Sequence, residues 1–128
     1  MILVIGGAYQ GKLDYVMENY PGKKVFRCDA GNPEMDLSAD IMSSFHLTVL
    51  AQIRAGIDTL VYLDEKLPEI KEKIIICDDI SCGVVPADPE TREWRETVGR
   101  CLGLLSQNAD EVIRVYCGIG SNLKVKLK

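Results

Sequence analysis

The first 20 residues limit the fold more than any other part of the chain. Residues 2–5 are an uninterrupted run of large aliphatic side chains, and a turn containing Gly6, Gly7 and Gly11 follows at once. The next stretch, residues 12–20, has a helical pattern. A strand that is apolar along its whole length is typical of a parallel sheet covered by helices on both faces. The opening of the chain therefore predicts an α/β fold.

The rest of the chain continues this alternation of strands and helices. Further strands are predicted at residues 24–28, 74–77 and 112–117, and further helices at 39–55, 59–72 and 89–108. A last strand, 123–127, follows a glycine-bearing turn and is expected to pair antiparallel. We therefore expect residues 1–128 to form one α/β domain, with a doubly wound, mostly parallel sheet and a C-terminal antiparallel edge hairpin.

Composition and charge exclude several classes of protein. The chain has 47% hydrophobic and 27% charged residues and a net charge of -4, which argues against a nucleic-acid backbone as the main partner. Its apolar runs are too short to span a membrane, and without a signal peptide we expect it in the cytoplasm. Its five cysteines lack C-x-x-C spacing, so we interpret them as reduced thiols. An unpaired edge strand makes a homo-oligomer one expectation for its assembly.

The glycine turn has the spacing of a phosphate-binding loop. Gly6 is followed after four residues by Gly11 and Lys12, so that backbone N–H groups can converge on a phosphate beside a mobile positive charge. The candidate nucleotide-binding residues are Gly6, Gly7, Ala8, Tyr9, Gln10, Gly11, Lys12 and Leu13. Leu13 occupies the position where a serine or threonine usually ligates Mg²⁺. The alternative interpretation is a plain glycine-rich turn with a solvated lysine.

Acidic residues follow two of the predicted strands. Asp78 and Asp79 end the run KIIICDD, and Asp29 ends KVFRCD. The carboxyl ends of parallel strands open toward one edge of a sheet, so these carboxylates are candidate Mg²⁺ ligands near Lys12. The alternative is that they cap the following segments or face water.

Several segments resemble the bifunctional adenosylcobinamide kinase and adenosylcobinamide-phosphate guanylyltransferase family of cobalamin biosynthesis. The family loop G-G-A-x-x-G-K-S appears here as GGAYQGKL. Its later G-I-V-P, G-R, A-D-E-V and G-I-x-x-x-[IL]-K patterns appear as GVVP, GR, ADEV and GIGSNLK. The resemblance covers about the first 20 and the last 55 residues. The middle, between Cys28 and Ile74, is shorter than in the family.

The resemblance implies a P-loop NTPase-like fold, GTP or ATP with Mg²⁺, and a corrinoid substrate. It implies phosphorylation of adenosylcobinamide and transfer of GMP from GTP to the product. In the family a histidine carries the GMP. His46 is the single histidine here, so it is the candidate carrier, with Asp79 as a catalytic residue that organises Mg²⁺. Alternatively, His46 is a helix-surface or half-buried residue beside Phe45, and the protein is a nucleotide-binding regulatory or interaction module that has lost catalysis.

Overall fold

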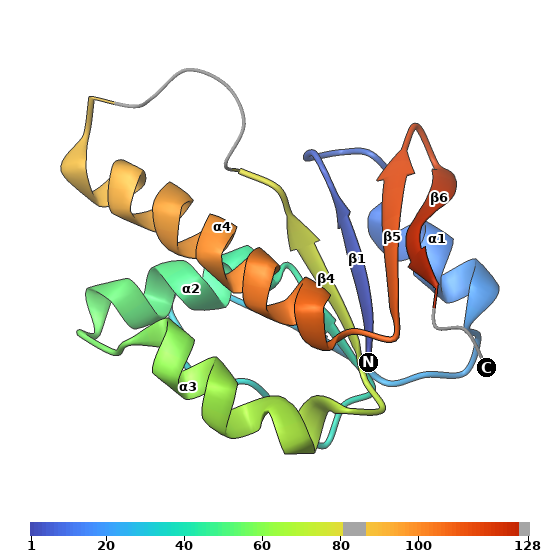
Figure 1. Ribbon diagram of the computed structural model, residues 1–128, viewed down its shortest axis with the longest axis horizontal. Helices are drawn as coiled ribbons and strands as arrows, with labels where there is room; N and C mark the ends of the chain where they lie inside the picture. Colours follow the sequence, from blue (N-terminus) through green and yellow to red (C-terminus); the bar gives the residue numbers. More distant parts are fainter. Residues whose placement is uncertain (81–86, 126–128) are drawn as a thin grey trace.

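A computed structural model describes residues 1–80 and 87–125. It is an α/β fold built on one six-stranded sheet, and Figure 1 shows how the helices lie around that sheet. The strand order is β2-β3-β4-β1-β5-β6. The strands are β1 (Ile2–Gly6), β2 (Val25–Arg27), β3 (Ile41–Ser43), β4 (Ile74–Asp78), β5 (Glu111–Tyr116) and β6 (Ile119–Val125). The first five are parallel, and β6 pairs antiparallel with β5 at the edge. The predicted mostly parallel, P-loop-like sheet with an antiparallel edge pair is confirmed.

The helices cover the sheet on both faces. They are α1 (Lys12–Asn19), α2 (Phe45–Arg54), α3 (Thr59–Lys66) and α4 (Pro89–Asn108), with a short 3₁₀ helix at Leu67–Ile70. Figure 1 shows α2, α3 and α4 together on one face and α1 on the other. In the described part of the chain, no helix is both long and apolar enough to cross a membrane.

The core consists of two apolar clusters, one on each face of the sheet. Successive side chains of β1 point into different clusters. Leu3 packs with α2 and α4, and Val4 packs with Val16 of α1. Both β1 side chains are buried. This arrangement confirms that the aliphatic opening run is a strand covered on both faces. The described cysteines are free thiols, as expected, and only Cys117 among them is exposed.

Two of the predicted helices differ from the structure. The helix predicted at 39–55 begins only at Phe45, because Ile41 and Met42 form β3, where they pair with Ile74 and Ile75 of β4. The helix predicted at 59–72 is α-helical only to Lys66 and then tightens into the 3₁₀ turn that contains Pro68, which has no N–H to donate to an α-helical bond.

The C-terminal hairpin begins earlier than predicted. β6 starts at Ile119 instead of 123, after a turn in which Cys117 and Gly118 both have positive φ. A register shift between Val112 and Ile113 marks a bulge in the β5–β6 pair. Residues 126–127 of the predicted strand lie outside the described residues, as do Cys82 and the GVVP motif.

Candidate functional site

The glycine turn joins β1 to α1 at the carboxyl edge of the sheet. Gly6 allows a close approach, because a Cβ there would lie 2.5 Å from the carbonyl oxygen of Val115. Gly11, which precedes α1, has φ 82°, a left-handed conformation that glycine adopts without strain. Gln10 ties the turn to the β5–β6 hairpin: its carbonyl accepts from the Gly118 N–H at 2.8 Å, and its side-chain oxygen accepts from Cys117 at 2.8 Å. Gln10 therefore anchors the loop to the hairpin through both its main chain and its side chain.

Lys12 is buried beneath this turn. Its side chain is 7% exposed, and its Nζ donates to the Gly7 carbonyl at 2.6 Å and lies 2.6 Å from Asp78 Oδ1. A solvated lysine on the first helical turn, the alternative interpretation, does not describe this arrangement. The ammonium group and the carboxylate from the end of β4 form a compact ion pair at the mouth of the loop.

A cavity of about 220 Å³ opens beside the pair. Its lining residues are Tyr9, Gln10, Gly11, Lys12, Leu13, Asp14, Arg27, Ser43, Ser44, Ile76 and Asp78. The last five of the eight predicted loop residues line it, whereas Gly6, Gly7 and Ala8 do not. The N-termini of α1 and α2 both border the cavity, and their unpaired N–H groups favour anions. Sequence reasoning missed Asp14, Arg27, Ser43 and Ser44. Arg27 lies next to the end of the strand predicted at 24–28, whereas Ser43 and Ser44 fall inside the helix predicted at 39–55, so the sequence pattern gave no signal for them.

His46 lies on the other side of Asp78. Its Nδ1 accepts the Asp78 backbone N–H at 3.1 Å, and its Nε2 is 3.5 Å from Asp78 Oδ2. Trp94 of α4 donates to the His46 carbonyl at 2.7 Å. Burial lowers the pKa of His46 below its ordinary value of 6.5, an effect that Asp78 opposes and Lys12 reinforces. The imidazole is therefore neutral at pH 7 and carries its proton on Nε2, so neither ring nitrogen offers a free lone pair.

The single histidine makes its titration directly measurable. We expect the His46 ring-proton NMR signal to titrate with a midpoint below 6.5. Because the unfolded chain then binds the proton more tightly, the contribution of His46 to stability is complete above pH 6.5 and is lost as the pH falls through the folded pKa. The variant His46→Gln should flatten this part of the curve of unfolding free energy against pH. A midpoint above 6.5 would contradict the prediction, because it would mean that the attraction of Asp78 outweighs the effect of burial.

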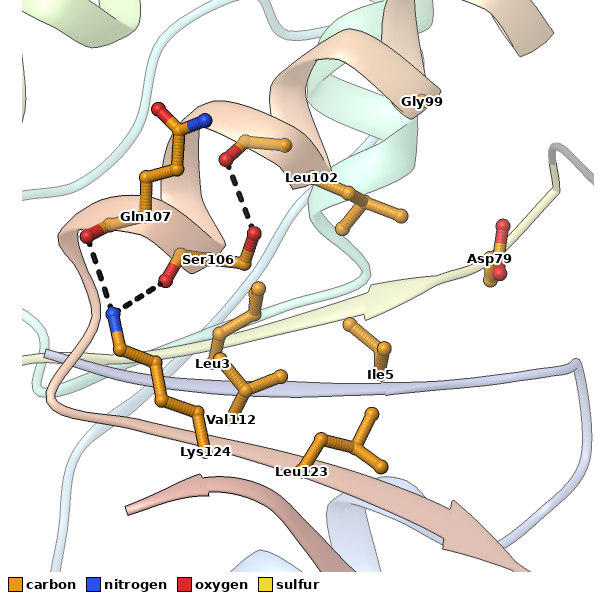
Figure 2. Close-up of a pocket in the computed structure, with 11 residues that line it drawn as sticks. Leu3, Ile5, Asp79, Gly99, Leu102, Ser106, Gln107, Val112, Leu123 and Lys124 are labelled. Atoms are coloured by element: carbon orange, nitrogen blue, oxygen red, sulfur yellow. Dashed lines mark hydrogen bonds between the residues drawn. The ribbon is translucent and has the colours of Figure 1, made fainter. Parts of the chain in front are cut away.

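Asp79 points away from the Lys12 cavity. It lies at one end of a larger groove of about 580 Å³ between α4 and the sheet, whose apolar walls include Leu3, Leu102 and Leu123 (Figure 2). At the other end of this groove Lys124 Nζ donates to the carbonyls of Ser106 and Gln107, the last turn of α4. Neighbouring residues of an extended chain point to opposite faces, which separates Asp79 from Asp78.

Asp29 does not line the Lys12 cavity either. It is exposed, and its Oδ1 accepts from the Gly31 N–H at 2.6 Å, which closes a local turn. The structure therefore does not bring Asp29, Asp78 and Asp79 together. Within residues 1–80 and 87–125, no group of three or more acidic, histidine or cysteine side chains is placed to hold a metal ion. The carboxylates that line the Lys12 cavity are Asp14 and Asp78.

A known protein family matches this chain. A family model described as cobinamide kinase / cobinamide phosphate guanyltransferase matches residues 39–123, which is well over half of the 128-residue chain. The chain belongs to this family. A search of individually curated proteins found no match.

The extent of the match differs from the resemblance noted in the sequence. The family model runs from residue 39, just before β3, to residue 123 within β6, and it includes most of the middle segment that the motifs did not cover. Ser43, His46 and Asp78 lie inside the cobinamide kinase / cobinamide phosphate guanyltransferase match, and the glycine turn lies before it. The family acts in cobalamin biosynthesis with nucleotide substrates.

Proposed function

We propose that this protein is a nucleotide-dependent transferase of cobalamin biosynthesis that phosphorylates the hydroxyl of adenosylcobinamide, using ATP or GTP. The observation that carries the proposal is the buried Lys12 beside Asp78, at a glycine turn and in a chain of the cobinamide kinase / cobinamide phosphate guanyltransferase family. The position of the turn at the carboxyl edge of a parallel sheet is where open α/β folds bind ligands.

Phosphoryl transfer requires mainly positioning and electrostatic stabilisation, and the cavity residues can supply both. Lys12 would exchange the Gly7 carbonyl for phosphate oxygens, and the loop N–H groups and the α1 N-terminus would hold the same phosphates. Arg27, an exposed residue that lines the same cavity, would add a second positive charge. Together these groups orient a nucleotide with its terminal phosphate toward the acceptor.

The residues present fit Mg²⁺, because Asp14, Asp78 and the two serines are all oxygen donors. Mg²⁺ is commonly held by one or two carboxylates together with water and substrate phosphates, so the absence of three clustered acids in the described residues does not conflict with it. When bound, the ion would offset the negative charge of the transferring phosphate. Asp78 would be its main protein ligand, after releasing Lys12 to the nucleotide.

Transfer of GMP through His46 is a second proposed step. An imidazole nitrogen would attack the α-phosphorus of GTP, forming an N–P bond while pyrophosphate leaves. His46 could do this with the lone pair of Nδ1, but only after that nitrogen gives up the Asp78 backbone N–H. We therefore propose that phosphorylation is the primary reaction, and that GMP transfer requires the imidazole to rotate.

Intact-mass spectrometry tests both steps in one mixture of protein, Mg²⁺, GTP and adenosylcobinamide, with a parallel mixture containing ATP. A phosphorylated corrinoid is the expected product, and a protein heavier by one GMP would identify the covalent step. The adduct should be absent in His46→Gln, whereas corrinoid phosphorylation should persist. An unmodified corrinoid in both mixtures would contradict the proposed enzyme.

The competing proposal is a nucleotide-binding module without catalysis. Leu13 favours it, because this residue cannot donate an oxygen to Mg²⁺. Leu13 packs against the apolar cluster under α1, so it contributes to the core as well as lining the cavity. If GTP or ATP binds while the corrinoid stays unmodified, this second proposal replaces the first.

A further inference from the structure

The phosphate-binding turn lacks one chemical group that its spacing implies. A hydroxyl at position 13 would face the phosphates and their metal ion, but Leu13 has only carbon atoms to offer there. Two residues with hydroxyl side chains, Ser43 and Ser44, nevertheless line the same cavity. They come from the end of β3, two strands away from the turn in the sheet order.

Ser43 is the last residue of β3 and is almost completely buried. Its residue is 5% exposed, yet it lines the cavity beside Ile76 and Asp78. Its backbone carbonyl accepts from the Cys28 N–H at 2.9 Å, which fixes the position of the strand end. The Ser43 hydroxyl is not one of the fully buried, unpaired side-chain atoms of the described residues, which belong to Thr48, Gln52 and Thr59. Ser43 instead lines the cavity from an otherwise buried strand end, where its hydroxyl can meet a ligand.

Ser44 adds an independent observation. It has φ 59° and ψ 46°, a left-handed conformation that is uncommon for residues other than glycine and is concentrated at functional sites. It also precedes α2 as the N-cap, a position where serine usually accepts a hydrogen bond from the first helical turn. Its side chain makes no such bond. The hydroxyl is therefore available to the cavity that it lines.

The charges around the two serines are those of a phosphate site. Arg27 of β2 pairs in register with Ser43 and lines the same cavity, and it forms no ion pair within the described residues. Lys12 lines the same cavity, and Ser44, the N-cap residue of α2, brings the positive end of that helix dipole to its border. Asp78 and Asp14 supply the carboxylate oxygens that a metal ion needs.

We propose that the hydroxyls of Ser43 and Ser44 bind the Mg²⁺–phosphate group of the nucleotide, in place of the loop hydroxyl that Leu13 lacks. This inference rests on the proposed function, since it assigns a ligand set to the same nucleotide. The hydroxyl oxygen that Leu13 cannot supply would then come from the end of β3.

The test compares nucleotide affinity with and without the metal ion. Dissociation constants for GTP and ATP would be measured by isothermal titration calorimetry, first with Mg²⁺ and then with EDTA. In the wild type we expect Mg²⁺ to tighten binding. In the double variant Ser43→Ala/Ser44→Gly we expect that tightening to fall about tenfold, the size of one or two charge-assisted hydrogen bonds, while affinity in EDTA changes little.

The variants separate ligand binding from folding. Glycine suits the backbone of position 44, so Ser44→Gly removes the hydroxyl without adding strain. Ser121→Ala, on the exposed strand β6, is the matched control and should keep the full Mg²⁺ effect. Adding Leu13→Ser to the double variant should restore part of the Mg²⁺ effect by returning a hydroxyl to the loop.

Two outcomes would overturn the inference, and they are distinguishable. If the double variant binds nucleotide with an unchanged Mg²⁺ effect, the serines are not ligands and the proposed function stands. If the wild type binds neither GTP nor ATP under either condition, the proposed function fails and the inference fails with it.

Discussion

Replacing Lys12 with methionine should weaken nucleotide binding by about 100-fold, because two or more charge-assisted hydrogen bonds to phosphate are lost. The buried ammonium group is the positive charge closest to the glycine turn, 2.6 Å from the Gly7 carbonyl. Methionine keeps the length and apolar character of the side chain and removes only the charge. The measurement is the dissociation constant of GTP and ATP in the presence of Mg²⁺.

Two controls separate loss of the charge from damage to the fold. Lys23→Met alters an exposed lysine before β2 and should leave affinity unchanged. Lys12→Met/Asp78→Asn removes both charges of the buried pair, so that Asp78 is not left as an unpaired carboxylate. The double variant should fold as stably as the single variant or more so, and should still fail to bind. If Lys12→Met binds GTP and ATP with full affinity, the glycine turn is not part of the nucleotide site.

Replacing Phe45 with alanine should lower the free energy of unfolding by about 3–5 kcal/mol. Phe45 is fully buried and is the first residue of α2, in the cluster between the sheet and α2–α4. Removing its ring leaves a cavity in this cluster, at the residue between Ser44 and His46. Urea denaturation followed by circular dichroism measures the loss, with Tyr116→Ala as a control at an aromatic residue that is 65% exposed.

The position of Phe45 also connects the core to the site. Because Phe45 holds the start of α2 against the sheet, its loss should loosen the Ser43–Ser44 segment before it unfolds the chain. Amide hydrogen exchange should therefore rise first in residues 43–47. A loss of stability under about 1 kcal/mol, comparable to that of Tyr116→Ala, would show that the start of α2 can repack without the ring.

The start of the chain could be predicted well from the sequence. A run of aliphatic residues, a glycine turn of fixed spacing and an amphipathic helix are local features, and the structure contains β1, the turn and α1 in those places. The alternation of patterns along the chain also predicted the fold class and the antiparallel edge pair. These features depend on side-chain periodicity and glycine conformations, which neighbours in the sequence largely determine.

The middle of the chain could not be predicted in the same way. The segment that contains β3 reads as part of a helix, because Ile41 and Met42 precede a genuine helical pattern without a glycine or proline between them. Its extended backbone is stabilised by hydrogen bonds to β2 and β4, whose residues lie far away in the sequence. Three-residue strands have too little local signal to compete with a neighbouring helix.

The sequence by itself determined that a lysine and several carboxylates would stand near the carboxyl edge of a parallel sheet. Only the tertiary structure decided which of them meet. Asp78 joins Lys12 and His46, whereas Asp79, one residue later, lies in the groove under α4. The reason is physical: a one-residue step reverses the direction of a side chain on an extended backbone. The order of the strands then decides which distant residues, here Ser43, Ser44 and Arg27, share a cavity with it.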